Sequence, residues 1–291
     1  MWAFNGSGRV GYNNGDDVPA KGEKGRVLVL DLTVAEIKKK LQTADEAEFA
    51  VLERSLVADM RKGVRSAVEV ARRRLEAARA ERERVEGMYA FQAELAAVHD
   101  ARVVVGLDEV GRGPVAGPLA VGAVVLSDFG IIEELNDSKQ LTHEQRERIA
   151  AQVKEEAVAW SVQYIEPHEI DAAGMTASLV TAFRRAVAAI EGQGVPVDLI
   201  LLDGNALHLD KREINVVKGD AKCASIAAAS ILAKVERDAL MTAYDAQYPA
   251  YGFASNKGYA SAEHIEAIKE HGLSPLHRVT FCEGFFQQSL F

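Results

Sequence analysis

The order of hydrophobic and polar positions divides the chain into a helical first third and an alternating remainder. Residues 1–26 carry Gly, Asn and Asp with little apolar periodicity, which predicts a disordered tail. Two Thr-x-x-Glu patterns, Thr33–Glu36 and Thr43–Glu46, then predict two helix starts. Apolar positions at helical spacing predict a third, long helix from about 64 to 97. Residues 27–99 are therefore predicted to form an all-helical extension.

From residue 100 onward, short apolar runs alternate with helical segments. The first run, Val103–Leu107, ends in two carboxylates. Further strands are predicted at 119–126, 161–165, 198–202 and 214–217, and helices at about 142–158, 176–192, 221–244 and 261–271. Strands that alternate with helices predict an α/β fold for residues 100–291, with a helical segment near the end.

Charge is distributed unevenly along the chain. The formal net charge is −9, and the whole acidic excess lies in residues 101–291. An acidic domain is a poor partner for phosphate unless cations bridge the two, so the distribution already favours a metal. The longest apolar stretches are too short to span a bilayer, and the N-terminal residues have no signal-peptide pattern. We therefore expect a cytoplasmic protein with no membrane contact; Cys223 and Cys282 are isolated and predict no disulfide framework.

Two of the predicted strands end in carboxylates. Asp108 and Glu109 follow the first strand, and Asp203 ends the run 198–202. Active sites of α/β proteins collect at strand ends, so these three side chains are expected to converge. Asp220 precedes the helix predicted at 221–244. Taken alone, Asp220 is more often a helix cap and Asp203-Gly204-Asn205 more often a turn.

Several carboxylates in one place repel one another unless they are protonated or neutralised by hard cations. Ligation by oxygen alone, without His or Cys, favours Mg²⁺ or Mn²⁺ over Zn²⁺. Two such ions can carry out in-line displacement at a phosphodiester. The acids therefore predict a metal-dependent site for phosphate chemistry.

A glycine-rich loop follows the first pair of acids. Gly111 and Gly113 allow the backbone to approach a ligand closely, with amide groups free to bind oxygen. A dinucleotide fingerprint is excluded by the spacing, by two prolines and by the strand that follows. A Walker loop is excluded because no Gly-Lys-Ser/Thr follows.

These blocks together resemble type 2 ribonuclease H (ribonuclease HII). The resemblance covers about 102–288, and a weaker likeness, which includes Arg61-Lys62, connects the N-terminal helices with an extension found in some bacterial members. The matching blocks, in order, are Asp108–Pro114 with Ala116-Gly117-Pro118, Asn136–Lys139, Leu202–Asn205, Lys218-Gly219-Asp220, Ser225–Lys234, Arg237-Asp238, Tyr251-Gly252-Phe253, Lys257-Gly258-Tyr259 and His277-Arg278 with Phe281.

The resemblance implies a ribonuclease H-like mixed sheet flanked by helices, and a role for each matching residue. The acids Asp108, Glu109, Asp203 and Asp220 would hold the metal ions. The backbone of Gly111-Arg112-Gly113 would sense the ribose 2′-hydroxyl, and Tyr259 would work with that loop, stacking on the adjacent sugar. A 2′-hydroxyl is the only local difference between RNA and DNA, so it must be probed at close range. Phosphate contacts are implied for Ser138, Lys139, Lys222 and Arg278.

The expected function is a metal-dependent endoribonuclease with Mg²⁺ or Mn²⁺ as cofactor. Its substrates would be RNA–DNA hybrids and duplex DNA containing single ribonucleotides, cut 5′ of the ribonucleotide to leave 3′-hydroxyl and 5′-phosphate ends. Two alternatives remain open: an enzyme restricted to multi-ribonucleotide hybrids, and a non-catalytic duplex-binding module. The arginines of the N-terminal helices suggest substrate contacts there. A structural role, as a mutual ion-pair group, is one of two open readings for Lys234, Arg237 and Asp238; the other is a role in the site.

Overall fold

The computed structural model of the chain describes residues 32–128, 130–208 and 210–286. It consists of two compact units, Met1–Ala77 and Ala78–Phe291. The tail predicted over 1–26 lies outside the described residues. The division falls inside the long helix, so the domain boundary expected near residue 100 remains a prediction.

The first unit contains α1 (Val34–Thr43), α2 (Glu46–Leu56) and the beginning of α3 (Lys62–Val98). The capping box at Thr33 and Glu36 is confirmed. The second predicted box is wrong by two residues: Asp45 caps α2, with Glu48 as its partner. The reason is local, because α1 continues through Thr43 and leaves Asp45 as the first extended residue with a capping side chain. The apolar sides of the three segments then enclose a small core that contains Ile37, Leu41, Phe49, Leu56 and Val64.

Several arginines of α3 are engaged in ion pairs within their own unit. Arg72 pairs with Glu53 at 2.6 Å and also with Glu69, while Arg84 pairs with Glu81 at 2.6 Å. The acidic partners partly balance the charge of Arg72 and Arg84, which weakens their attraction for phosphate. Phosphate binding by the arginines of the N-terminal helices remains a prediction.

The second half of α3 belongs to the second unit because its side chains pack against the sheet. Met88 is buried in the core between α7 and α4, and Phe91 and Leu95 pack against the side of β1 and β4. The Gln92 carboxamide oxygen accepts a hydrogen bond from the Ser225 backbone N–H at 2.9 Å. The last turns of α3 are therefore part of the core of the second unit.

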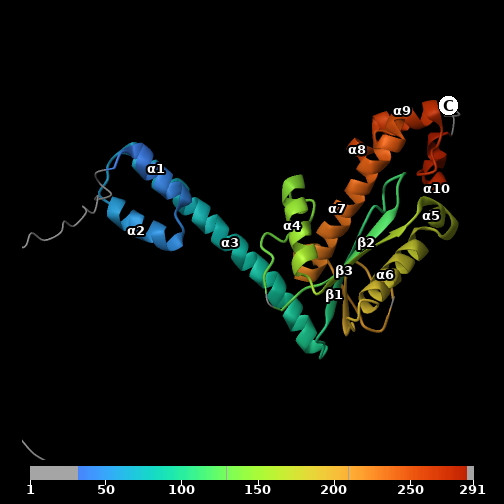
Figure 1. The fold of residues 1–291 in the computed structure, drawn as a ribbon, viewed down its shortest axis with the longest axis horizontal. Helices are drawn as coiled ribbons and strands as arrows, with labels where there is room; N and C mark the ends of the chain where they lie inside the picture. Colours follow the sequence, from blue (N-terminus) through green and yellow to red (C-terminus); the bar gives the residue numbers. More distant parts are fainter. Residues whose placement is uncertain (1–31, 129, 209, 287–291) are drawn as a thin grey trace, which may run out of the picture. The chain divides into compact units, whose positions relative to one another are not determined.

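The second unit is built on a five-stranded mixed sheet in the order β3-β2-β1-β4-β5 (Figure 1). The strands are β1 (Val104–Val110), β2 (Leu119–Val125), β3 (Ala159–Ile165), β4 (Leu199–Asp203) and β5 (Glu213–Val216). β1 pairs antiparallel with β2 and parallel with β4, so it is the central strand that joins the two kinds of pairing. The predicted mixed sheet flanked by helices is confirmed.

One strand end differs from the prediction in a way that matters for the site. β1 continues through Val110, so Asp108 and Glu109 lie within the strand and not after it. The cause is the partner strand, because Asp108 pairs with Gly122 and Glu109 with Val121. Pairing with β4 has already ended at Leu107 and Leu202. β1 thus projects beyond β4, and its two acids point to opposite faces of the sheet because successive side chains of a strand alternate.

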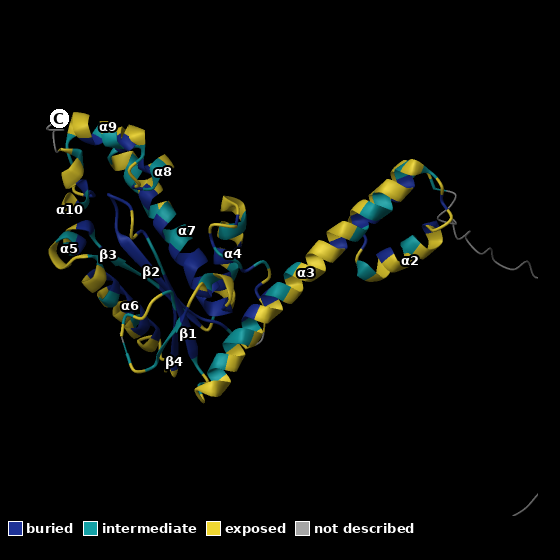
Figure 2. Ribbon diagram, turned by 180° about the vertical axis from the view of Figure 1, so that it is seen from behind, coloured by how far each residue is buried: buried dark blue, intermediate teal, exposed yellow. Residues whose placement is uncertain are grey.

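Two helices cover the two faces of the sheet (Figure 1). α6 (Met175–Glu191) packs on one face, where Phe183 joins Leu107 and Val121 in the core. α7 (Ala224–Gln247) packs on the other, with α4 (His143–Glu156) beside it. The strands and the first half of α7 form the buried centre of the unit (Figure 2). The expectation that small side chains bring α7 close to the sheet is confirmed, because Ala227, Ala228 and Ala229 are all fully buried.

Short elements complete the second unit. The sequence did not predict α5, which fills the connection from β3 to α6. The remaining bounds are α5 (Pro167–Ala173), η2 (Gly219–Ala221), η3 (Pro249–Tyr251), α8 (Phe253–Asn256), α9 (Ala262–His271), α10 (Val279–Cys282) and η4 (Glu283–Phe285). Within the described ranges, no helix is both long enough and apolar enough to cross a membrane.

Gly122 allows the close approach of α7, and its substitution tests this packing. A Cβ atom at Gly122 would lie 2.3 Å from the Ala229 carbonyl oxygen, which is helix backbone and cannot rotate away. We expect Gly122→Ala to lower the free energy of unfolding by about 1–3 kcal/mol in urea titrations. Gly87→Ala is the matched control, because nothing lies within 4 Å of a Cβ there. Equal stability of the two variants would contradict this account.

Candidate active site

The parallel register of β1 and β4 brings two carboxylates together. Leu107 pairs with Leu202, so the next residues along the two strands, Asp108 and Asp203, are neighbours. Asp203 is the last residue of β4, and Gly204 follows it with a φ of 81°. The strand-end reading of Asp203 is therefore correct, and the chain bends directly after it at Gly204 and Asn205. Asp108 and Asp203 are neighbours because of this register, which the sequence alone does not display.

Asp108 is the most deeply buried of the candidate acids. Its side chain is 7% exposed and lies on the face covered by α7. Burial raises the pKa of this carboxyl well above its usual range, and the charges of Glu109 and Asp203 raise it further. A hydrogen bond with the Ser230 hydroxyl opposes this rise in the pKa. Ser230 therefore contacts the site from α7, a role missed when its segment was read as packing.

Glu109 is joined to the glycine-rich loop by an ion pair. Its Oε1 lies 3.0 Å from Arg112 Nη1. Burial raises the pKa of Glu109, while the hydrogen bond and charge of Arg112 lower it and Asp203 raises it. The carboxylate is thus held toward Arg112, and the pair connects the acids to the loop.

Asp220 lies in the 3₁₀ turn η2, and the helix begins only at Ala224. The helix-cap reading of Asp220 is wrong, because Cys223 occupies the N-cap position. Burial raises the pKa of Asp220, and the charges of Asp203 and Asp137 raise it further. The Gly219 backbone N–H donates to Asp203 Oδ1 at 2.5 Å, which ties this turn to the end of β4. Asp137 is a further acid near the site that sequence reasoning did not single out.

The four acids influence one another electrostatically but are not assembled as a ligand set. Across residues 32–128, 130–208 and 210–286, no group of three His, Cys, Asp or Glu side chains is arranged to hold a metal ion. The contacts above explain this: Arg112 holds Glu109, and the Gly219 amide holds Asp203. The donor chemistry nevertheless fits a hard divalent cation, since all four side chains offer oxygen and a cation would relieve their mutual repulsion.

The glycine-rich loop lies against the segment that carries Tyr259. The Gly258 carbonyl oxygen accepts hydrogen bonds from Val115 N at 2.9 Å and Ala116 N at 3.2 Å. A Cβ atom at Gly113 would lie 3.8 Å from Tyr259 Cε1, so the tyrosine ring borders the loop. Tyr259 is 48% exposed, and its backbone carbonyl is 2.8 Å from His264 Nδ1. The ring of Tyr259 is thus accessible, while His264 holds the backbone that carries it.

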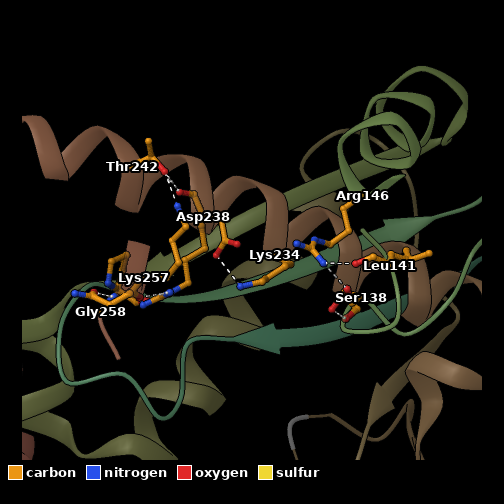
Figure 3. Close-up of polar contacts among 12 residues, drawn as sticks. Ser138, Leu141, Arg146, Lys234, Asp238, Thr242, Lys257 and Gly258 are labelled. Atoms are coloured by element: carbon orange, nitrogen blue, oxygen red, sulfur yellow. Dashed lines mark hydrogen bonds and ion pairs between the residues drawn. The ribbon is translucent and has the colours of Figure 1, made fainter. Parts of the chain in front are cut away.

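Three of the four candidates for phosphate contact, Ser138, Lys139 and Lys222, differ in exposure and in their hydrogen-bond or ion-pair partners. Lys139 is largely exposed, and its Nζ is 3.9 Å from Asp137 Oδ1. Lys222 donates to the Val217 carbonyl at 2.8 Å. Ser138 is buried, with its hydroxyl 3.2 Å from that of Ser230, and Arg146 holds its carbonyl at 2.9 Å (Figure 3). Direct contact with phosphate therefore remains a prediction for the two lysines and is disfavoured by burial for Ser138.

The fourth phosphate candidate, Arg278, requires a correction. Its side chain is fully buried, and its guanidinium group donates to the carbonyls of Gly111, Arg112 and Gly117. A guanidinium that is enclosed and already bonded to the backbone is not available to a phosphate group. Burial, together with the charge of Arg237, lowers the pKa of Arg278 to about 10.

The ion-pair group considered around Lys234 is present only in part. Lys234 and Asp238 pair at 2.8 Å along α7 (Figure 3). Arg237 is fully buried and binds the carbonyls of Ala116, Pro118 and Lys257. It therefore supports the loop, like Arg278, and does not share in the pair.

Comparison with known proteins agrees with this arrangement. The family model described as "Ribonuclease HII" matches residues 105–284, and one described as "Ribonuclease HII N-terminal domain" matches residues 33–96. The chain belongs to the ribonuclease HII family. It is therefore a ribonuclease H-type endonuclease, from a family of metal-dependent enzymes.

Named relatives support the assignment over most of the chain. A ribonuclease HII of Ruminiclostridium cellulolyticum is 43% identical over 209 residues, covering 71% of this chain and 80% of the relative. A ribonuclease HII of Bacillus licheniformis is 39% identical over 250 residues, covering 86% and 96%. The crystal structure of ribonuclease H2 from Pyrococcus horikoshii OT3 is similar with a TM-score of 0.53 and 29% identity, covering 64% of this chain and all of that one.

Proposed function

We propose that the chain hydrolyses the phosphodiester bond 5′ of a ribonucleotide within a duplex, leaving 3′-hydroxyl and 5′-phosphate ends. Its substrates are RNA–DNA hybrids and duplex DNA with single embedded ribonucleotides. The observation that carries this proposal is the position of the Gly111–Gly113 loop, between an electrostatically coupled group of acids and an exposed tyrosine. Such a loop can test for a 2′-hydroxyl next to the bond that is cut.

The acids Asp108, Glu109, Asp203 and Asp220 would hold Mg²⁺ or Mn²⁺. When bound, the ions supply positive charge that activates water and stabilises the departing oxygen. The residues of the chain supply the rest: Arg112 orients Glu109, and the Gly219 amide orients Asp203. Burial raises the pKa values of Asp108, Glu109 and Asp220, and a bound cation would offset that cost of ionisation, which supports this assignment.

The deciding experiment uses a DNA duplex that contains one ribonucleotide, incubated with and without Mg²⁺ and mapped on a sequencing gel. We expect one cut on the 5′ side of the ribonucleotide, only with the metal. An all-RNA strand paired to DNA serves as the companion substrate. Cleavage of that hybrid alone would favour the restricted enzyme, and binding without cleavage in either ion would favour a non-catalytic module.

Tyr259 is expected to select the junction between RNA and DNA. Its ring is exposed beside Gly113, so it can stack on the sugar of the next nucleotide and disfavour a second 2′-hydroxyl there. We expect Tyr259→Ala to lower kcat/KM at a single ribonucleotide about 10-fold to 100-fold, if the contact with the sugar is comparable to an aromatic ring stacked on a base, about 1–3 kcal/mol. Duplex binding should change far less, and Tyr259→Phe should retain most activity. An equal loss of binding and cleavage would indicate that the ring only packs.

A further inference from the structure

Two buried arginines hold the loop that the proposed function uses for recognition. Arg278 Nη2 donates to the Gly111 carbonyl at 2.6 Å, and Nη1 donates to the Arg112 carbonyl at 3.0 Å. Nε and Nη2 also donate to the Gly117 carbonyl, at 3.1 and 2.9 Å. Arg278 thus holds both ends of the segment Gly111–Gly117, which contains the Gly111–Gly113 loop.

Arg237 supports the same loop from α7. Its Nε donates to the Pro118 carbonyl at 2.9 Å, and its Nη2 donates to the Ala116 carbonyl at 3.2 Å. Its Nη1 donates to the Lys257 carbonyl at 2.9 Å, two residues before Tyr259. One guanidinium therefore connects the end of the loop to the segment that carries the tyrosine.

The orientation of the loop amides follows from these bonds. In a trans peptide the carbonyl of one residue and the N–H of the next point in opposite directions. Because the carbonyls of Gly111 and Arg112 point inward to Arg278, the N–H groups of Arg112 and Gly113 point away from it. Neither amide has a hydrogen-bond acceptor among the described residues. Two donors are thus presented on the side of the loop away from Arg278.

The cost of this arrangement argues for a specific role. Both guanidinium groups are fully buried, and the hydrogen bonds of each are made to backbone carbonyls. Buried charge is expensive, and two like charges near one another are more so. Apolar side chains could fill the same space, but they would not orient the peptide planes of the loop.

We propose that Arg278, supported by Arg237, is a positioning residue for ribonucleotide recognition: it holds the Arg112 and Gly113 amides toward the substrate's 2′-hydroxyl. This inference rests on the proposed function. It assigns the residue neither to phosphate binding nor to the metal site. The consequence is that its loss should remove selectivity for the ribonucleotide while leaving the acids able to bind metal.

The test compares Arg278→Met, Arg278→Lys and wild type on three properties. These are kcat/KM on a duplex with one ribonucleotide, affinity for the same duplex made only of DNA, and the rise in Tm on adding Mn²⁺. For Arg278→Met we expect cleavage to fall about 100-fold, as for loss of an oriented donor, with the other two properties within about 2-fold of wild type. Arg278→Lys should be intermediate, because one ammonium nitrogen cannot reach all three carbonyls.

Phe183→Leu is the matched control for lost stability, because Phe183 is fully buried on the opposite face of the sheet. It should lower Tm without a selective loss of cleavage. Unchanged cleavage in Arg278→Met would overturn the proposal, as would a parallel loss of all-DNA binding, which is the signature of a phosphate contact. If Arg278→Met does not fold, wild-type selectivity in Arg278→Lys overturns it equally. Failure of wild type to cut the single-ribonucleotide duplex would instead refute the proposed function.

Discussion

Asp203→Asn should abolish cleavage while leaving the protein folded. Asp203 is the central acid of the site, because its charge acts on Asp108, on Glu109 and on Asp220. Removing that charge weakens the hold of the whole group on a divalent cation. We expect kcat in Mg²⁺ to fall about 10³-fold or more on an RNA–DNA hybrid. Asparagine retains an oxygen that can accept the Gly219 N–H bond, so the turn should persist.

The control for this prediction is Asp137→Asn. Asp137 also acts on Asp220, but its Oδ1 accepts the Lys139 backbone N–H at 2.9 Å and shapes its own turn. Asparagine preserves that bond, so we expect a loss of only about 10-fold, as for a residue outside the ligand group. Circular dichroism and thermal unfolding should be close to wild type for both variants. Wild-type activity of Asp203→Asn in Mg²⁺ would refute its assignment as a metal-holding acid.

The sequence predicted the elements that local patterns determine. The Thr33 capping box lies at its predicted residues, and the helix over 143–156 lies within its predicted range. The end of β1 was not predictable in this way, because it depends on pairing with residues of β2 that lie ten or more positions later in the chain. Asp108 and Glu109 were identified correctly as a pair of acids, but their place inside the strand required the partner's register.

Residues whose role depends on distant contacts were harder to interpret. Arg278 matched a family block, and an arginine near a nuclease site is naturally read as a phosphate ligand. Its partners Gly111, Arg112 and Gly117 lie more than 160 residues earlier in the chain. Nothing in the local sequence distinguishes a buried guanidinium from an exposed one. Ser230 was hidden for a similar reason, since it stands in a helix whose other small residues only pack.

The second large effect concerns stability, and it opposes function. Asp108→Asn should make the metal-free protein more stable at pH 7 while removing its activity. Burial and two neighbouring acids raise the pKa of Asp108 well above its usual range, so the ionised form destabilises the fold. Asparagine removes the charge and keeps an oxygen for the Glu109 N–H bond, which is 2.8 Å in wild type. We expect Tm to rise by about 3–6 °C, which corresponds to about 1–2 kcal/mol.

The pH dependence gives this prediction its sign. When the pKa of a carboxyl is higher in the folded than in the unfolded protein, the folded protein becomes less stable as the pH rises from the unfolded pKa through the folded pKa. The advantage of Asp108→Asn should therefore disappear as pH falls and the wild-type carboxyl takes up a proton. Added Mg²⁺ should also reduce the difference, because it stabilises wild type more than the variant.

Asp198→Asn is the opposite case and completes the experiment. The Asp198 carboxylate accepts hydrogen bonds from the backbone N–H groups of Arg102 and Val103, which lower its pKa. The same substitution should therefore lower Tm at pH 7, and the loss should fade toward acidic pH, where Asp198 takes up a proton. Two Asp→Asn changes in one protein would then shift stability in opposite directions. A decrease in Tm for Asp108→Asn would mean that the charge of the Asp108 carboxylate is compensated without metal. The electrostatic argument that these acids hold a cation would then fail.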